Sequence, residues 1–377
     1  MLKNVAFILL TFLVLAGAVV VIPLVVPNLP LGGAPRSILA PAASVAKSFN
    51  GGESWFEKIR LDTDRTLKGV SILDLAIDVK DPNRLFLGTR GNGLFRSDDG
   101  GESWRRVFDF FGVLDPSSSV FEIAIDQRDR ERLYLATSER GLGKVFKSED
   151  GGQSFREVYI TPVKNVPIFA VAIHPTDPRV LYMGTGQGGI FQSIDFGETW
   201  QVLRWVNDPV IQLIISPSNP RILWALTRRN GLWMSRDAGL SWSQILEEWR
   251  AFPRASETVT MAVDPRSADT LYVGSNFGLL RTRDGGASWQ EVSGVWADDS
   301  LPVRAITVDP GDSRVLYAGV NSLIYKSSDG GSRWETLSLR TSRRIGVVRV
   351  HPKDSKILWA GMSEAGIEFP FIGDFLF

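Results

Sequence analysis

Residues that commonly perform acid, base or metal chemistry are sparse in this chain of 377 residues. Histidine occurs only as His174 and His351, and cysteine is absent. Without cysteine the chain has no thiol nucleophile, no disulfide and no metal site built on thiolates. Two histidines cannot form a metal cluster by themselves. The sequence therefore predicts no metal and no cofactor.

Both histidines occupy a position that recurs along the chain. Each ends an apolar segment and precedes proline, and aspartates end several similar segments. A recurring position implies a recurring role, so we interpret the histidines as turn residues rather than catalytic bases. The aspartates at the matching positions are Asp78, Asp126, Asp264 and Asp309.

Paired carboxylates are the other candidate chemistry, because hydrolysis of a glycosidic bond needs two of them about 5–10 Å apart. Several acidic residues fall between predicted strands, where solvated surface charge is the ordinary interpretation. We therefore predict no catalytic residue. The acidic residues in question are Asp62, Asp64, Asp109, Asp208, Glu247, Glu248, Glu257, Asp298 and Asp299.

Arginine and tryptophan in predicted loops are candidates for binding. Guanidinium groups suit acidic or planar partners, and exposed tryptophans anchor proteins or stack on sugars. For the tryptophans we favour packing between blades over binding, because large apolar side chains are usually buried. The candidate binding residues are Arg90, Arg140, Arg228, Arg229, Arg343, Arg344, Trp205, Trp249 and Trp296.

The elements that must position these residues are set by an internal repeat. Seven segments have the form S/T-x-D/N-x-G-x-x-W/F, and their starts are 42 to 51 residues apart. This spacing is typical of one four-stranded propeller blade. The segments begin at Ser48, Ser97, Ser148, Ser193, Ser235, Thr282 and Ser327, and end at Trp55, Trp104, Phe155, Trp200, Trp242, Trp289 and Trp334.

The repeated segment has a physical explanation as a turn. The Asp or Asn side chain accepts hydrogen bonds from backbone N–H groups, and glycine allows a positive φ. The aromatic residue then packs between sheets. These polar residues are therefore predicted to be structural: Asn50, Asp99, Asp150, Asp195, Asp237, Asp284 and Asp329.

The chain ends indicate how the ring closes. The last unit, 347–361, has strand-like segments but no such turn, whereas the first turn, at Ser48, lacks preceding strands. Joined, they complete one blade and remove free sheet edges. We predict an all-β fold, a seven-bladed β-propeller over residues 45–370 with four-stranded blades, closed by N- and C-terminal strands, and a tail over 371–377. Six and eight blades are the alternatives.

The N-terminus contains an uncharged apolar run from Val5 to Val26, preceded by Lys3. Its length suits a single helix across a bilayer with the rest of the chain outside the cytoplasm. A signal peptide cleaved near Ala18 is the alternative, and both export the chain. We favour a retained anchor over residues 1–26 because residues 19–26 stay apolar. Residues 27–44 are rich in Pro, Ala and Gly, which predicts a linker.

Strings such as Gly93-Leu94-Phe95-Arg96-Ser97-Asp98-Asp99-Gly100-Gly101-Glu102-Ser103-Trp104 resemble BNR/Asp-box repeat proteins. Sialidases, xyloglucanases, sortilin receptors and the photosystem II stability and assembly factor family share this turn, so the resemblance specifies the fold better than the function. The size and layout are most similar to the assembly factors, which implies a non-enzymatic, protein-binding role.

The enzyme families fit less well. Sialidases use a Tyr–Glu nucleophile, but five of the six tyrosines fall at strand positions and only Tyr159 is off-pattern. The Arg-Ile-Pro signature of many sialidases is also missing. Xyloglucanases work in a cleft between two propellers, whereas this chain supplies repeats for one.

Charge excludes one class of partner. Lys plus Arg and Asp plus Glu both number 42, so no excess positive charge points to nucleic acid. The sequence thus predicts a membrane-anchored, extracytoplasmic scaffold, assembly factor or accessory subunit that binds a protein, such as a membrane complex. A carbohydrate-binding or glycoside hydrolase propeller is the alternative.

Overall fold

The structure is a computed structural model that describes residues 10–15, 18–23, 43–62, 65–294, 301–337, 339 and 341–364. The chain forms two units, residues 1–36 and 37–377. In the first unit, β1 (Leu10–Leu15) and β2 (Ala18–Pro23) pair as an antiparallel hairpin.

The hydrophobic helix predicted for the N-terminus is not shown by this structure. Its described part is extended, and β2 contains four consecutive β-branched residues, 19–22, which favour strands over helices. Among the described residues, none lies in a helix with the length and apolarity needed to cross a bilayer.

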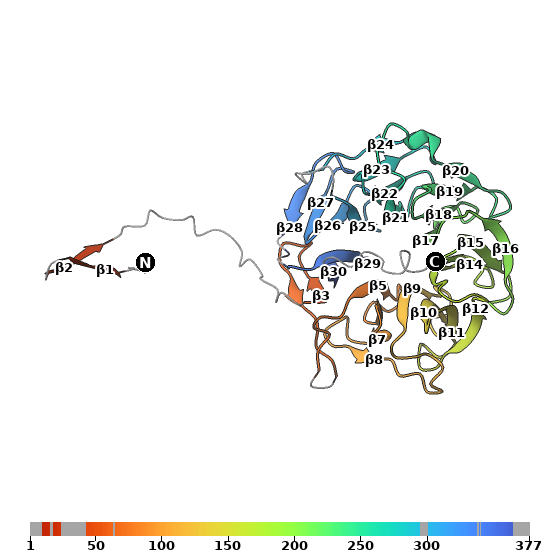
Figure 1. The fold of residues 1–377 in the computed structure, drawn as a ribbon, viewed down its shortest axis with the longest axis horizontal. Helices are drawn as coiled ribbons and strands as arrows, with labels where there is room; N and C mark the ends of the chain where they lie inside the picture. Colours follow the sequence, from red (N-terminus) through yellow and green to blue (C-terminus); the bar gives the residue numbers. More distant parts are fainter. Residues whose placement is uncertain are drawn as a thin grey trace. The chain divides into compact units, whose positions relative to one another are not determined.

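The second unit is a closed ring of seven blades, each a four-stranded antiparallel sheet, as predicted. In Figure 1 the innermost strands face a common centre. The first three blades are β5 (Ile72–Ile77), β6 (Leu85–Thr89), β7 (Leu94–Ser97) and β8 (Arg105–Arg106); β9 (Ser119–Ile125), β10 (Leu133–Glu139), β11 (Leu142–Ser148) and β12 (Arg156–Ile160); and β13 (Ile168–Ile173), β14 (Leu181–Thr185), β15 (Gly189–Ser193) and β16 (Gln201–Trp205).

The next three blades follow the same order from the centre outward. They are β17 (Val210–Ile215), β18 (Leu223–Thr227), β19 (Leu232–Ser235) and β20 (Ser243–Ile245); β21 (Thr258–Val263), β22 (Leu271–Ser275), β23 (Leu279–Thr282) and β24 (Gln290–Glu291); and β25 (Val303–Val308), β26 (Leu316–Val320), β27 (Leu323–Ser327) and β28 (Glu335–Leu337). A short 3₁₀ helix, η1 (Glu247–Trp249), follows β20.

The seventh blade joins the two ends of the chain. It combines β29 (Arg344–His351) and β30 (Asp354–Ser363) with β3 (Val45–Ser48) and β4 (Phe56–Glu57). β3 pairs with β30 from Val45 opposite Gly361 to Ser48 opposite Leu358. This confirms the predicted strand closure, which completes the seventh blade and closes the ring.

The core lies between neighbouring blades. Every residue of the second strand is buried in five blades, in β6, β14, β18, β22 and β26. A strand covered on both faces favours continuous apolar sequence, and each of these strands is mostly apolar, as in Leu85-Phe86-Leu87-Gly88-Thr89. The blades therefore hold together mainly through hydrophobic packing of their faces.

The seven Asp-box turns lie between the third and fourth strands and share one set of hydrogen bonds. In the first blade, Ser97 Oγ donates to Asp99 Oδ1 over 2.7 Å and accepts from the Gly101 amide over 2.8 Å. The Ser103 amide donates to Asp99 Oδ1 over 2.9 Å, and Gly101 has a φ of 87°. Trp104 is 1% exposed. The box residues are therefore structural, as the turn chemistry predicts.

Candidate functional site

Each innermost strand contains a β-bulge near its first residue. In all seven blades the register to the second strand shifts there, so one residue is left unpaired. A bulge bends the strand and redirects side chains. The unpaired residues are Leu73, Phe121, Phe169, Ile211, Val259, Arg304 and Gly346.

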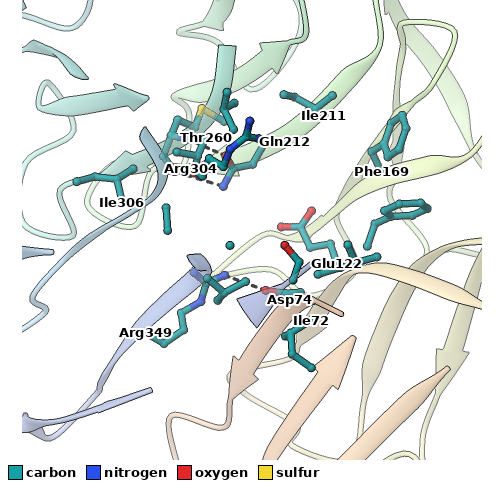
Figure 2. A pocket seen from close by; sticks show the side chains of 18 of the residues that line it. Ile72, Asp74, Glu122, Phe169, Ile211, Gln212, Thr260, Arg304, Ile306 and Arg349 are labelled. Carbon is teal, nitrogen blue, oxygen red and sulfur yellow. Dashed lines mark hydrogen bonds and ion pairs between the residues drawn. The ribbon is translucent and has the colours of Figure 1, made fainter. Parts of the chain in front are cut away.

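The bulges surround a cavity of about 170 Å³ in the central channel, and all seven unpaired residues line it. Phe121 and Phe169 meet edge to face there, with ring centroids 4.9 Å apart. Arg304 is the charged member of this otherwise apolar ring (Figure 2). The bulge residues thus contribute apolar surface and one guanidinium group to the cavity, which other polar side chains also line.

The residues that follow three of the bulges accept hydrogen bonds from the innermost strand of the next blade. Asp74 Oδ2 accepts from the Ile123 amide over 3.0 Å, and Glu122 Oε2 accepts from the Val171 amide over 3.0 Å. Gln212 Oε1 accepts from the Met261 amide over 2.8 Å. A neutral amide does the same work as the carboxylates, so bridging between blades is the shared role of this position.

Asp74 and Glu122 both point into the cavity (Figure 2). Arg349 Nη2 is 2.8 Å from Asp74 Oδ1. Burial in the channel wall, and then the charge of Asp74, raise the pKa of Glu122 to about 8. At neutral pH Glu122 therefore holds a proton for most of the time, beside the arginine-paired Asp74.

Arginines gather at one end of the channel, where the turns between second and third strands meet the starts of the innermost strands. The Arg90 amide donates to the Ser71 carbonyl, and the Arg228 amide donates to the Pro209 carbonyl. The Arg90 side chain lines the central cavity. Its Nη1 is buried and finds no hydrogen-bond partner within the described part of the chain, and burial lowers its pKa.

A second recess lies beside this end of the channel and shares Arg304 with it. It is lined by Arg228, Arg229, Arg304, Glu257 and Asn276, among others. Arg254 and the Asn276 amide bind Glu257 and lower its pKa, so this carboxylate is already engaged. We call Arg90, Arg228, Arg229 and Arg304 the channel-mouth arginines.

The other predicted binding arginines lie elsewhere or have structural roles. The Arg140 side chain is 79% exposed, and its Nε and Nη2 both donate to Asp115 Oδ2 in an ion pair. Arg343 is buried and donates to the Val70 carbonyl over 3.0 Å and to Ser71 Oγ over 3.2 Å, which ties the last blade to the first. Arg344, which begins β29, is half-buried.

The three predicted binding tryptophans do not form one surface. Trp205 is 48% exposed at the end of β16. Trp249 is instead 2% exposed and packs edge to face on Trp289, with ring centroids 5.0 Å apart. It belongs to the core because η1 folds it inward, which corrects its assignment to the rim. Trp296 lies outside the described residues.

The candidate carboxylates in loops mostly stabilise turns. The buried Asp208 accepts from the Arg229 and Asn230 amides, and Asp109 accepts from several amides. Glu247 and Glu248 lie in η1, and Asp62 is exposed. Asp64, Asp298 and Asp299 lie outside the described residues.

The two histidines act as turn acceptors, as predicted. The Asp177 amide donates to His174 Nδ1 over 3.1 Å, and the Lys353 amide donates to His351 Nδ1 over 3.0 Å. Asp78 accepts from the Lys80 amide in the same way. Burial lowers the pKa of both histidines. Among the described residues, no group of three His, Cys, Asp or Glu side chains is arranged to hold a metal ion.

Sequence reasoning missed Asp74, Glu122 and Arg304. Their signal is present in the repeat: each is a charged residue inside an innermost strand whose matching positions in other blades are mostly uncharged, as with Arg304 against Phe169 and Ile211. Charge in such a strand marks a side chain that faces the channel.

Two family models match parts of the chain. The model described as sortilin and neurotensin receptor 3 matches residues 143–273, and the model for the photosynthesis system II assembly factor YCF48 matches residues 242–346. Comparison of the sequence with curated proteins gives no significant match.

Solved structures share the fold at low identity. A GH74 xyloglucanase from Xanthomonas campestris has a TM-score of 0.63 and 19% identity over 78% of this chain and 51% of that chain. YCF48 from Cyanidioschyzon merolae has a TM-score of 0.61 and 16% identity over 78% and 96%, respectively. A complex of YCF48 with the D1 peptide has a TM-score of 0.61 and 17% identity over 82% and 96%.

The chain spans about half the length of the xyloglucanase structures and nearly the whole length of the YCF48 structures. This propeller architecture therefore serves both hydrolases and proteins that bind peptides. The seven equal turns, the two family models and the ring together identify the chain as a seven-bladed β-propeller of BNR (Asp-box) repeats.

Proposed function

We propose that this propeller is a non-enzymatic protein-binding module whose channel-mouth arginines take an acidic segment of a partner protein. The observation that carries the proposal is the buried Nη1 of Arg90, which lacks a hydrogen-bond partner within the described residues. A buried donor without a partner is costly, and an acidic group entering the channel would satisfy it.

Two further observations support this function. The recess beside the channel gathers Arg228, Arg229 and Arg304, while its acidic residue, Glu257, is already bound by Arg254. A similarly folded structure is YCF48 in complex with a peptide, and the YCF48 model matches the segment that contains Arg304. On this basis we propose an assembly factor or accessory subunit that grips an extended segment of another protein.

A binding assay with matched variants tests the proposal. The probe is a short fluorescent peptide rich in Asp and Glu, compared with its Asn and Gln counterpart. Arg304→Ala should weaken binding of the acidic peptide at least tenfold, or about 1.4 kcal/mol. Arg314→Ala is the control, because Arg314 pairs with Asp312 in a turn at the opposite end of the channel. Equal binding of both peptides by the wild type would refute the acidic-partner proposal.

A glycoside hydrolase is the second candidate function. Asp74 and Glu122 place two carboxyls in the channel, of which that of Glu122 has a raised pKa, and glycosidic hydrolysis uses a pair of carboxyls with one such acid. Against this, both carboxyls also bridge blades as the neutral Gln212 does. Release of sugar from xyloglucan oligosaccharides by the wild type and not by Glu122→Gln would favour this candidate over the first.

We further propose that the propeller lies outside the cytoplasm and is held to the membrane by its N-terminal apolar run. In a bilayer a two-stranded hairpin leaves edge amides unsatisfied, whereas a helix satisfies them, so we propose that residues 5–26 are helical there. The full chain should resist alkaline carbonate extraction. A mature protein that begins near Val19 and is wholly extracted would instead show cleavage.

A further inference from the structure

The connection between β8 and β9 presents phenylalanines that neither the repeat nor the channel mouth explains. The side chains of Phe108, Phe110 and Phe111 are 72%, 84% and 71% exposed. The rings of Phe110 and Phe111 lie edge to face, with centroids 5.2 Å apart. Clustered apolar side chains at a surface mark an interaction site more often than scattered ones do. We call residues 107–114 the phenylalanine loop.

The loop has a fixed shape. Its ends, Val107 and Leu114, are each 4% exposed and pack in the core between the first two blades. Between them, the Asp109 carboxylate is turned inward and accepts from the amides of Val113 and Leu114, and from the Phe155 amide of the next blade. The phenylalanines are therefore held in place before any partner arrives, which lowers the entropy cost of binding.

The amides at the tip of the loop are also satisfied from within the protein. The Phe110 amide donates to the Gln153 carbonyl over 3.3 Å, and the Gly112 amide donates to the Asp109 carbonyl over 3.0 Å. The Phe111 amide donates to Asp109 Oδ1 over 3.4 Å. With Val113 and Leu114, every amide from 110 to 114 is bonded internally. Lipid demands this of a backbone, whereas a protein partner can supply the missing bonds itself.

The chemistry of the three exposed side chains also favours lipid over a protein surface as the partner of the loop. Phenylalanine offers no polar atom for specific recognition, whereas protein interfaces depend on Tyr, Trp and Arg at their centres. Phenylalanine is also one of the residues with which surface-bound segments enter the boundary between headgroups and acyl chains. The exposed tip thus suits an apolar phase better than a patterned protein surface.

The place of the loop in the fold allows it to reach a membrane. It follows the outermost strand of the first blade and contacts the start of the outermost strand of the second, so it lies at the outer edge of the ring. The neighbouring seventh blade receives the chain from residues 27–44 through β3. These 18 residues span at most roughly 60 Å.

We propose that the phenylalanine loop inserts into the interfacial layer of a lipid bilayer and fixes the edge of the propeller against the membrane. The inference rests in part on the proposed N-terminal anchor, because a short tether raises the effective concentration of the loop at the bilayer. Insertion of the loop can then be weak by itself and still hold the edge of the propeller at the bilayer.

The absence of native cysteine provides a direct test with the full chain. Phe110→Cys, labelled with an environment-sensitive fluorophore, is mixed with phosphatidylcholine vesicles that contain a lipid-attached quencher. The label should shift to the blue and be quenched. Leu240→Cys is the matched control, because Leu240 is 86% exposed on the fourth blade. Its label should not change.

Replacing Phe108 and Phe111 by Ser in the labelled Phe110→Cys chain should abolish the blue shift and leave the melting temperature unchanged, since both side chains are exposed. Co-sedimentation with vesicles is read separately and reports the anchor. A shift without firm co-sedimentation supports the loop and counts against the anchor. Co-sedimentation without any blue shift overturns the loop proposal and leaves a protein as the partner of the loop. A blue shift that appears when the labelled protein is concentrated without vesicles overturns it in favour of self-association.

Discussion

The two ends of the central channel are bordered by turns of the same seven blades, yet the fold fixes the residues of the two sets of turns to different degrees. On one side, every Asp box repeats one hydrogen-bond pattern, so that Gly52, Gly101 and Gly331 all donate to a Ser or Thr hydroxyl in the same way. On the other side, Arg90 and Arg228 stand where the third and fifth blades have Gly186 and Asn276, as their shared backbone hydrogen bonds show.

The difference shows where function is free to vary. The Asp-box turns must satisfy their own amides and place an aromatic residue in the core, so their residues are fixed by stability. The turns at the channel mouth have backbone contacts that do not depend on the side chain, as with the Arg228 amide and the Pro209 carbonyl. The fold therefore does not dictate which side chains these turns carry.

The largest expected effect is on the free energy of unfolding, for an aromatic residue of an Asp box. Trp289→Ala should lower the free energy of unfolding by about 3–5 kcal/mol, because Trp289 is 8% exposed and packs on Trp249. Urea unfolding measures the change. Trp205→Ala is the control, since Trp205 is half exposed and should lose far less. Similar losses in both variants would contradict the structural role of the Asp-box aromatics.

The next effect is on binding at the channel mouth. Reversing Arg228 and Arg229 to Glu should weaken capture of the acidic peptide more than tenfold, about 1.4 kcal/mol, without lowering the melting temperature. Salt should weaken wild-type binding, because exposed charges are screened over about 8–10 Å.

The matched control for this double variant is charge reversal of Arg179 and Arg314, which are 63% and 76% exposed in turns at the other end of the channel. It carries the same change in net charge. If both double variants lose affinity equally, long-range charge and not the channel mouth determines binding.

The fold could be predicted almost completely from the sequence because the Asp box is a local motif. Its Ser, Asp, Gly and Trp lie within eight residues, and seven copies count the blades directly. The composite last blade followed from a missing turn at Val347–Gly361 and an unpaired one at Ser48. Each of these inferences needed only residues that are neighbours in the chain.

The site was only partly predictable because it depends on register and on distant contacts. The bulge that turns Arg304 into the channel is visible only once β25 is paired with β26. Trp249 was a candidate for the rim, with burial the favoured interpretation, and only the structure shows that η1 folds it against Trp289, 40 residues later in the chain. The sequence places several arginines in turns, but their division between the cavity, the recess and an ion pair with Asp115 required the structure.

A smaller effect concerns the pH dependence of stability through Glu122. Burial raises the pKa of its carboxyl from an ordinary 4.5 to about 8, so the folded state retains a proton that the unfolded chain releases. Stability should therefore fall as pH rises from about 4.5 to about 8. Glu122→Gln keeps an oxygen for the Val171 amide and cannot ionise, so it should remove this fall.

Urea unfolding at pH 5 and pH 9 tests this expectation. The variant should gain stability relative to the wild type at the higher pH. An unchanged difference between the two proteins at both values would mean that Glu122 is ionised in the folded state without cost.

The smallest effect is expected for the stability that the Asp-box carboxylates lose at acidic pH. Hydrogen bonds from the Thr199 hydroxyl and then its amide lower the pKa of Asp195 to about 2. The stability that this carboxylate contributes is present above the unfolded pKa near 3.8 and is lost as pH falls towards 2. Asp195→Asn should therefore reduce the loss of stability between pH 4 and pH 2.

The seventh blade shows why this substitution should be tolerated at neutral pH. There Asn50 Oδ1 accepts from the Ser54 amide over 3.0 Å, and its Nδ2 donates to Ser54 Oγ over 2.9 Å. The turn thus forms without a charge. The reciprocal variant, Asn50→Asp, should increase the acid dependence by the same mechanism. If acid titration of unfolding shows no opposite shift between the two variants, the boxes are held by geometry alone and the charge of their carboxylates adds nothing.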